Sequence, residues 1–235
     1  MSISEAEKIT VNTYDNIARI RRGMTTNKDF WRDIYLQFVR RLRNPRVLDL
    51  GCGDGRDAEL HQSITGSLGG YSGLDLSYEM LICAKGRNLV DHKLVREKIV
   101  EAEPLVQGDF YKLPFRDNIF NLVWAPASLI HTPRELLREP LAEINRVTDV
   151  GGKVFFAMKY GRGEKWEEGK SAEDRRFVVY WGKGNFGEVL NDAGFSIVDA
   201  YVDSTRDNRH VPWLCVFADK NLRYKINLEN ETEKI

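Results

Sequence analysis

The sequence predicts an α/β protein built on a mostly parallel sheet, and three observations predict it. Residues 47–57 combine a short apolar strand, a glycine-rich turn and the start of a helix. Apolar strand segments alternate with helical segments through residues 46–160, and the run 119–125 alternates too little for a strand with one exposed face. Alternating strands and helices favour parallel pairing, and strands covered on both faces are typical of such sheets.

Composition limits the partners that the chain can bind. The 235 residues suit one globular domain, and Lys+Arg and Asp+Glu are both 35, so no overall field favours nucleic acid or an anionic membrane. Residues 1–46 hold ten Lys and Arg against five Asp and Glu. This excess indicates either a solvated helix surface or a modest basic face for an anionic substrate.

Cysteine usage and hydropathy exclude several classes of protein. Cys52, Cys83 and Cys215 lie far apart without metal-ligand spacing, so we expect neither a metal site nor a disulfide framework. No signal-peptide pattern precedes the first helix, and no apolar run approaches the roughly 20 residues that span a bilayer. We expect a cytoplasmic protein without membrane segments, monomeric or homodimeric.

Two helices are predicted before the first strand, over residues 5–22 and 28–43. The second has a broad apolar stripe, with Asn27 as its N-cap. We expect residues 1–45 to cover the mouth of a ligand site. Tyr14, in the first helix, then either lies over the ligand or packs against the protein.

The turn after the first strand is the strongest local signal. Gly51, Gly53 and Gly55 follow the apolar strand at alternate positions. Glycine allows positive φ and close approach of the backbone to a ligand, and the next helix offers free N–H groups. A dinucleotide fingerprint, G-x-G-x-x-G, would need another glycine or alanine where Arg56 stands.

Two later strand ends also carry acidic residues. The strand 71–76 contains Asp75, 24 residues after Gly51, where a carboxylate can accept two ribose hydroxyls. The alternative role, capping the next helix, suits Ser77 better. A helix over 78–88 and a charged stretch precede a strand at 104–107, which ends in Gly108-Asp109-Phe110.

The spacing G-x-G-x-G, with Asp49 two residues before it, resembles motif I of the class I S-adenosylmethionine-dependent methyltransferases. The segment 141–147 followed by Gly-Gly and a strand is also similar to that family, and the resemblance covers residues 46–219. It suits the small-molecule enzymes of methyltransferase types 11 and 25. It implies a Rossmann-like three-layer sandwich whose seven strands are ordered 3-2-1-4-5-7-6, with strand 7 antiparallel. It also implies that Asp109 binds the adenine amine and Phe110 flanks the ring.

Two positions depart from the family pattern. Asn121 replaces an acidic residue common early in strand four, a difference that we interpret as structural. The segment 125–128, Ala-Pro-Ala-Ser, lacks the [DNS]-P-P-aromatic signature of enzymes that methylate exocyclic amines of bases.

The remaining elements complete the predicted core, residues 46–220. Leu137 to Val147 forms a helix, with Pro140 at a break or in the first turn, and a fifth strand covers 153–159. The polar, charged stretch 161–176 indicates a lid or a surface loop. The last part of the predicted core begins with an apolar segment at 177–181 and a helix capped by Asn185. Two strands follow, at 195–202 and 211–219, and are expected to pair as an antiparallel hairpin before a charged tail at 221–235.

These patterns predict the site and the activity. We expect transfer of a methyl group from S-adenosylmethionine, which becomes S-adenosylhomocysteine, by direct displacement to a small-molecule acceptor. The alternatives are a tRNA or protein methyltransferase, a non-catalytic subunit that binds the cofactor for a partner, and a nicotinamide enzyme.

His131 is the candidate base or a residue that shapes the substrate site. Lys159, Tyr160, Arg176 and Tyr180 are candidates to recognise an anionic or aromatic substrate, or they face solvent. The predicted cofactor-binding residues are Tyr14, Asp49, Gly51, Cys52, Gly53, Gly55, Asp75, Leu76, Asp109, Phe110 and Ala125.

Overall fold

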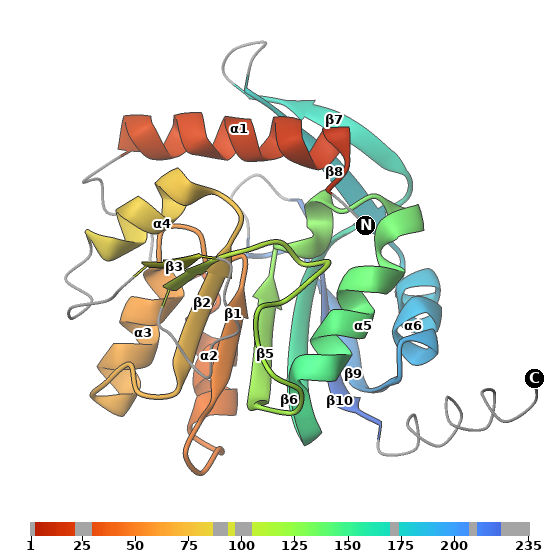
Figure 1. Ribbon diagram of the computed structural model, residues 1–235. Coiled ribbons are helices and arrows are strands. Elements are labelled where there is room, and N and C mark those ends of the chain that lie inside the picture. Colours follow the sequence, from red (N-terminus) through yellow and green to blue (C-terminus); the bar gives the residue numbers. More distant parts are fainter. Residues whose placement is uncertain are drawn as a thin grey trace, which may run out of the picture.

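The computed structural model describes residues 3–21, 30–86, 94–96, 105–169, 174–206 and 211–221. Helices lie on both faces of a central sheet, and helix α1 lies across one end of it (Figure 1). The strands are β1 (Val47–Leu50), β2 (Tyr71–Asp75), β3 (Leu94–Arg96), β4 (Leu105–Gln107), β5 (Phe120–Pro126), β6 (Thr148–Tyr160), β7 (Glu164–Glu168), β8 (Arg175–Trp181), β9 (Phe195–Asp203) and β10 (Trp213–Lys220).

The sheet has the predicted class and strand order. Its strands run β3-β4-β2-β1-β5-β6-β10-β9, and the seven predicted strands correspond to β1, β2, β4, β5, β6, β9 and β10. β1 pairs in parallel with β2 and β5, whereas β10 pairs antiparallel with both β6 and β9. The order 3-2-1-4-5-7-6 with an antiparallel strand 7 is therefore confirmed, and β3 extends the edge beside β4.

The loop predicted over residues 161–176 is wrong in part, because much of it forms the β7–β8 hairpin. Glu167 pairs with Arg176 and Glu168 with Arg175 across the two strands, and the rings of Trp166 and Phe177 lie 5.5 Å apart. Opposite charges facing each other on neighbouring strands stabilise a ladder. The charge density that indicated a loop therefore reflects cross-strand pairing.

The helices agree with the predictions more closely at their centres than at their ends. The second helix begins later and ends earlier than predicted, with Trp31 at its N-terminus and no side-chain cap; Asn27, the expected cap, lies outside the described residues. Pro140 lies in the first turn of α5, and Gly182 rather than Asn185 precedes α6. The helices are α1 (Glu5–Arg21), α2 (Arg32–Val39), α3 (Arg56–Thr65), α4 (Tyr78–Lys85), α5 (Arg138–Val147) and α6 (Lys183–Asp192), with 3-10 turns η1 (Leu129–His131) and η2 (Arg134–Leu136).

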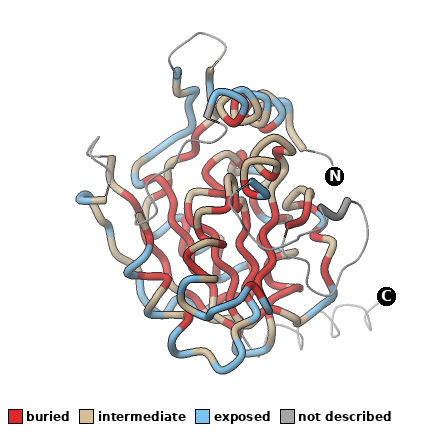
Figure 2. The backbone as a smooth tube through the Cα atoms, turned by 90° about the vertical axis from the view of Figure 1, so that its left-hand side faces the viewer, coloured by how far each residue is buried: buried red, intermediate tan, exposed pale blue. Residues whose placement is uncertain are grey.

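Aromatic side chains join α2 to the sheet. Trp124 of β5 stacks on Phe155 of β6 with ring centroids 4.6 Å apart, and Tyr35 of α2 packs edge-on against Trp124 at 4.9 Å. Buried residues run along the central strands (Figure 2). Because such rings bury large apolar areas, this packing holds the sheet rigid beneath the ends of its strands.

Among the described residues, no helix is both long and apolar enough to cross a membrane. No group of three or more His, Cys, Asp or Glu side chains in that part of the chain is arranged to hold a metal ion.

Candidate functional site

A cavity of about 710 Å³ lies where the carboxyl ends of β1, β2, β4 and β5 meet α1. We call its sheet side the floor: the turn 51–55, the end of β2 at Asp75, and the loop 108–117. We call the opposite side the roof: α1 together with η1 and β8, which contact α1. Ligand cavities in open α/β sheets occur at this edge, and their volumes run from about 300 to 1,000 Å³.

Glycines shape the floor at the β1 turn. Gly51, Gly53 and Gly55 have φ values of 74°, 54° and 78°, which side chains rarely adopt. A Cβ on Gly51 would lie 2.7 Å from Cβ of Ser128, so the backbone must pass close to the end of β5. A Cβ on Gly53 would meet nothing within 4 Å, and Gly53 lines the cavity.

Asp75 is fixed in the wall by the backbone. Its carboxylate accepts hydrogen bonds from Gly53 N and Ser77 N, both at 2.8 Å. Burial raises the pKa of Asp75 to about 6, which these two hydrogen bonds only partly offset. Ser77 caps α4 by accepting from Met80 N, as the sequence indicates, so Asp75 is left to face the cavity.

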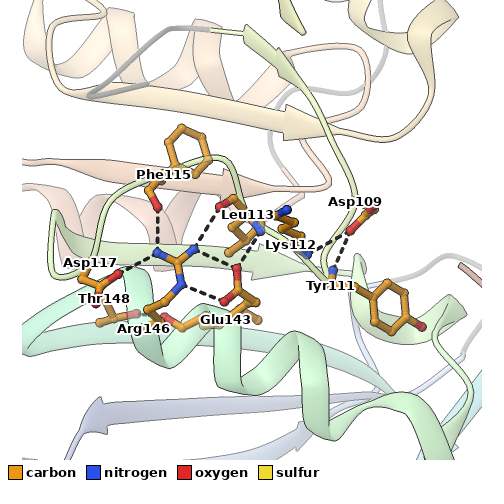
Figure 3. Close-up of polar contacts among 10 residues, drawn as sticks. Asp109, Tyr111, Lys112, Leu113, Phe115, Asp117, Glu143, Arg146 and Thr148 are labelled. Carbon is orange, nitrogen blue, oxygen red and sulfur yellow. Dashed lines mark hydrogen bonds and ion pairs between the residues drawn. The ribbon is translucent and has the colours of Figure 1, made fainter. Parts of the chain in front are cut away.

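The loop after β4 brings Asp109 and Phe110 to the same cavity. Oδ1 of Asp109 accepts from Tyr111 N at 2.9 Å and Lys112 N at 3.0 Å, which leaves Oδ2 for a ligand (Figure 3). Phe110 approaches the turn closely enough that its Cζ would lie 3.6 Å from a Cβ on Gly51.

Arg146 of α5 holds this loop in place (Figure 3). Its guanidinium donates to the carbonyls of Leu113 and Phe115 and to the carboxylates of Asp117 and Glu143, which uses all five N–H donors. Glu143 also accepts from Leu113 N at 2.7 Å. The planar, fixed fork of arginine suits a clamp of this kind.

Glu7 attaches the roof to the floor. Ser4 and Glu7 form a capping box that starts α1: Ser4 Oγ and N donate to the Glu7 carboxylate, and Glu7 N donates to Ser4 Oγ at 3.2 Å. The same carboxylate accepts from Tyr111 Oη at 2.9 Å and from Thr132 Oγ1 at 3.3 Å. One buried carboxylate therefore joins α1, the loop that carries Asp109, and the turn after η1.

Two threonines attach α1 to β8. Thr10 Oγ1 accepts from Phe177 N at 3.0 Å, and Thr13 Oγ1 donates to the carbonyl of Arg175 at 2.8 Å. Further along α1, Asp15 accepts from Ser77 Oγ. Because these contacts run along the helix, the hairpin and α1 form one roof.

Tyr14 and His131 meet inside the cavity. Tyr14 Oη lies 2.8 Å from Nε2 of His131, whose Nδ1 lies 2.6 Å from the carbonyl oxygen of Phe177. Burial lowers the pKa of His131 to about 4. Burial raises the pKa of Tyr14, and the charge and hydrogen bond of Arg176 oppose that shift; the Arg176 guanidinium carbon lies 6.0 Å from the Tyr14 ring centroid.

Four of the predicted cofactor residues are absent from the lining of the cavity: Asp49, Cys52, Gly55 and Ala125. Asp49 is buried, accepts a hydrogen bond from Tyr71 Oη, and has a raised pKa because of burial and the neighbouring Asp57 carboxylate. Cys52 is also buried, and Ala125 is fully enclosed in β5. The acidic residue before the glycines therefore joins β1 to β2 inside the protein.

Three of the four predicted substrate residues lie close together. Lys159 and Tyr180 are cross-strand partners on β6 and β8, and Tyr180 Oη donates to Glu167, which is the cross-strand partner of Arg176. Arg176 lies beside Tyr14, and the buried Lys159 ammonium lies 4.6 Å from the Trp213 ring. Tyr160 lines a different cavity, beside Gly161.

The described residues that line the cavity carry more acidic than basic side chains. Arg56 is the one Lys or Arg among the residues that line the cavity in the described chain, against five carboxylates: Glu7, Asp54, Glu59, Asp75 and Asp109. Among the described residues of the segment 1–46, no Lys or Arg lines the cavity.

Comparison with known proteins agrees with this geometry. A family model described as Methyltransferase domain matches residues 48–156. The malonyl-[acyl-carrier protein] O-methyltransferase of Buchnera aphidicola is 30% identical over 155 residues, 66% of this chain and 53% of that protein. Sterol 24-C-methyltransferase erg6 of Schizosaccharomyces pombe is 28% identical over 180 residues, 72% of this chain and 44% of that protein. The chain thus spans about half the length of these relatives.

A solved structure shares the fold. The 1,6-didemethyltoxoflavin-N1-methyltransferase of Burkholderia thailandensis, crystallised with its substrate and S-adenosylhomocysteine, has a TM-score of 0.66 and 18% identity, covering 94% of this chain and 92% of its own. Residues 48–156 are therefore similar to a methyltransferase domain, and the chain has the fold of solved S-adenosylmethionine-dependent methyltransferases. S-adenosylmethionine is the cofactor expected of this family.

The floor of the cavity fits that cofactor. Gly53 leaves the space that a Cβ would fill, and Asp75 presents a carboxylate at the distance along the chain that ribose recognition requires. The hydroxyl of Ser128 is buried at the cavity without a hydrogen-bond partner among the described residues. Buried polar atoms of native proteins are normally paired, so this hydroxyl suits a polar group of a ligand.

Sequence reasoning missed several residues that line the cavity. Thr10, Tyr111 and Ser128 line the cavity without being predicted, because none belongs to a local motif. The Ser4-x-x-Glu7 pattern is a recognisable capping box, but nothing in it reveals that Glu7 would also bind Tyr111 and Thr132.

Proposed function

We propose that this chain is an S-adenosylmethionine-dependent methyltransferase that acts on a small-molecule acceptor held under the α1 roof. One observation carries the proposal: the glycine turn, Asp75 and the Asp109–Phe110 pair reach a single cavity from three different strand ends. When bound, S-adenosylmethionine supplies an electrophilic methyl group on a sulfonium, which an acceptor takes by direct displacement. The protein then has mainly to align the two reactants, which can contribute roughly 7 to 11 kcal/mol.

Each residue of the floor has a distinct role in this proposal. The Asp75 carboxylate accepts hydrogen bonds from the two ribose hydroxyls, and hydrogen bonds from Gly53 N and Ser77 N fix its position. The free Oδ2 of Asp109 accepts the adenine amine, while Phe110 flanks the ring. Gly53 allows the backbone to approach the cofactor, and the unpaired hydroxyl of Ser128 binds a polar group at the same edge.

The α1 side of the cavity supports a small acceptor. Tyr14, Glu7 and Thr10 close one side, and a macromolecular acceptor would need that side open. The acidic wall repels RNA phosphates, which supports a neutral or cationic acceptor rather than a nucleic acid.

The test of cofactor binding is calorimetry with S-adenosylhomocysteine. Asp75→Ala should weaken binding at least about 100-fold, because two hydrogen bonds to a buried charged group are lost. Asp192→Ala, which removes an exposed surface carboxylate, is the matched control and should leave affinity unchanged. Equal affinity in both variants would contradict the ribose assignment.

The test of activity is transfer of labelled methyl from S-adenosylmethionine into fractionated small molecules, RNA and protein. We expect label in a small-molecule fraction only. Label in RNA or protein would replace the proposed acceptor class, and an absence of label in every fraction would contradict the proposed activity.

A further inference from the structure

The hydrogen bonds around His131 define which atoms carry protons. A carbonyl oxygen only accepts, so Nδ1 of His131 must donate to Phe177 O. The ring is neutral near pH 7, because burial disfavours its charged form, so Nε2 has a lone pair and no proton. Tyr14 Oη therefore donates its hydrogen to Nε2 across 2.8 Å.

The hydrogen bond from Tyr14 to His131 determines how Tyr14 can bind a ligand. Its only proton points at His131, so its oxygen can receive a hydrogen bond from the cavity but cannot give one. Arg176 stands beside the same hydroxyl as a positive charge. The charge of Arg176 favours release of the Tyr14 proton toward His131, and a phenol oxygen that releases its own proton to a base can take up another from the cavity.

We propose that Tyr14 and His131 form a proton relay that removes the proton from a hydroxyl or N–H acceptor as it is methylated. The proposal rests on the proposed methyltransferase function and names the acceptor class for that site. Tyr14 is then the catalytic residue that touches the acceptor, and His131 receives the proton through it.

The step balances in atoms and charge. A lone pair of the acceptor atom forms the new bond to the methyl carbon, and the carbon–sulfur bond breaks with its electron pair remaining on sulfur. The acceptor's proton passes to Tyr14 Oη while the proton of Tyr14 passes to Nε2 of His131. The positive charge lost at sulfur thus appears on the imidazolium, whose Nδ1–H donates to Phe177 O. The proton taken up at Nε2 later leaves to solvent.

Charged groups on every side of His131 fit this role. Arg176 and Lys159 disfavour the imidazolium, whereas Glu167 and the Phe177 carbonyl favour it. The imidazolium is consequently a transient state that readily releases its proton. Acceptors whose nucleophilic atom carries no proton, such as thioethers and tertiary amines, gain nothing from the relay.

The kinetic test compares variants on the small-molecule fraction that takes up label from the wild-type protein. Tyr14→Phe keeps the ring and should slow transfer about 100-fold with S-adenosylhomocysteine affinity within twofold of wild type. His131→Gln should slow it equally, and the double variant should be no slower than either, because the two residues act as a unit. Thr13→Val removes a different hydroxyl from the same helix and should slow transfer by less than about fivefold.

Two further readouts separate the relay from a packing role. The transfer rate of Tyr14→Phe should rise with pH up to the acceptor's own pKa, since the acceptor must then lose its proton to solvent, whereas the wild-type rate should change little above pH 6. Nitrogen-15 NMR of the histidines should show His131 as the neutral tautomer protonated on Nδ1, with the Nε2 signal shifted in Tyr14→Phe.

The outcomes that overturn the relay are distinct from failure of the enzyme assignment. Transfer by Tyr14→Phe within threefold of wild type, or a proton on Nε2 of His131, overturns the relay while leaving the methyltransferase assignment intact. If the wild-type protein labels no fraction at all, the proposed function fails and the relay fails with it.

Discussion

The floor and the roof of the cavity are assembled from different kinds of interaction. The floor consists of turns that directly follow β1, β2 and β4, and backbone N–H groups hold its functional carboxylates. The roof consists of α1, η1 and β8, which are joined by side-chain hydrogen bonds between residues far apart in the sequence: Thr10 and Phe177 are 167 residues apart, and Tyr14 and His131 are 117 apart. We therefore expect changes in the floor to affect folding and cofactor binding, and changes in the roof to affect the acceptor.

The largest effect should come from Gly51→Ala in the floor. Its Cβ would lie 2.7 Å from Cβ of Ser128 at a φ of 74°, so both strain and a clash oppose it. We expect a loss of at least about 3 kcal/mol in the free energy of unfolding, measured by urea denaturation.

Gly53→Ala is the matched variant: its φ of 54° also strains the backbone, but the added Cβ meets no atom within 4 Å. Its free energy of unfolding should fall by only about 1 kcal/mol, while its affinity for S-adenosylhomocysteine should fall about tenfold or more because the methyl group enters the cavity. Equal stability losses in the two variants would contradict the packing described for Gly51.

The next largest effect should come from Arg146→Ala. Loss of the clamp leaves the carbonyls of Leu113 and Phe115 without this donor and the Glu143 carboxylate without its cation, which should lower stability by about 2–4 kcal/mol and S-adenosylhomocysteine affinity about tenfold. Arg138→Ala on the same helix removes a well-exposed ion pair and should change neither by a measurable amount. An Arg146 variant with full cofactor affinity would show that the loop keeps its conformation without the clamp.

A smaller effect should follow from pH. Because the folded-state pKa of Asp75 is about 6 and ribose hydroxyls bind its ionised form, affinity for S-adenosylhomocysteine should be constant above pH 7 and fall as the pH drops below 6, by up to about tenfold at pH 5. Calorimetry in buffers of different ionisation enthalpy should detect proton release on binding near pH 6. Asp75→Asn should bind weakly at every pH, and a pH dependence that persists in it would place the titrating group elsewhere.

The smallest effect on stability and cofactor affinity should come from a threonine that holds the roof together. Thr10→Val removes one hydrogen bond to Phe177 N and should lower stability by about 1 kcal/mol without changing S-adenosylhomocysteine affinity more than twofold. Asn16→Ala, on an exposed position of the same helix, should have no effect. A large loss of cofactor affinity in Thr10→Val would erase the distinction between floor and roof.

The same distinction explains how much of the molecule could be predicted from its sequence. The strand order and the positions of Gly51, Gly53, Asp75, Asp109 and Phe110 follow from patterns within a few residues of each strand end, and the structure brings these five residues to one cavity. Their binding roles stay predictions.

The roof was predicted less well because its contacts are not local. From the sequence alone, the charged residues that pair across the β7–β8 hairpin indicate a loop. Nothing near Glu7 in the sequence indicates that it would join Tyr111 to Thr132, because both partners lie more than 100 residues away. Arg146 belongs to a segment similar to the methyltransferase family, yet its contacts with the loop could be seen only in the folded chain.

Hydrogen–deuterium exchange with and without S-adenosylhomocysteine tests the central claim most directly, namely that one cavity between the floor and the roof holds the cofactor. We predict slower exchange on binding in the turn 51–55, in residues 108–112 and along α1 around Tyr14, with no change in α6, which is absent from the cavity lining. Protection confined to another part of the molecule, or protection of the floor with α1 exchanging as before, would contradict the account.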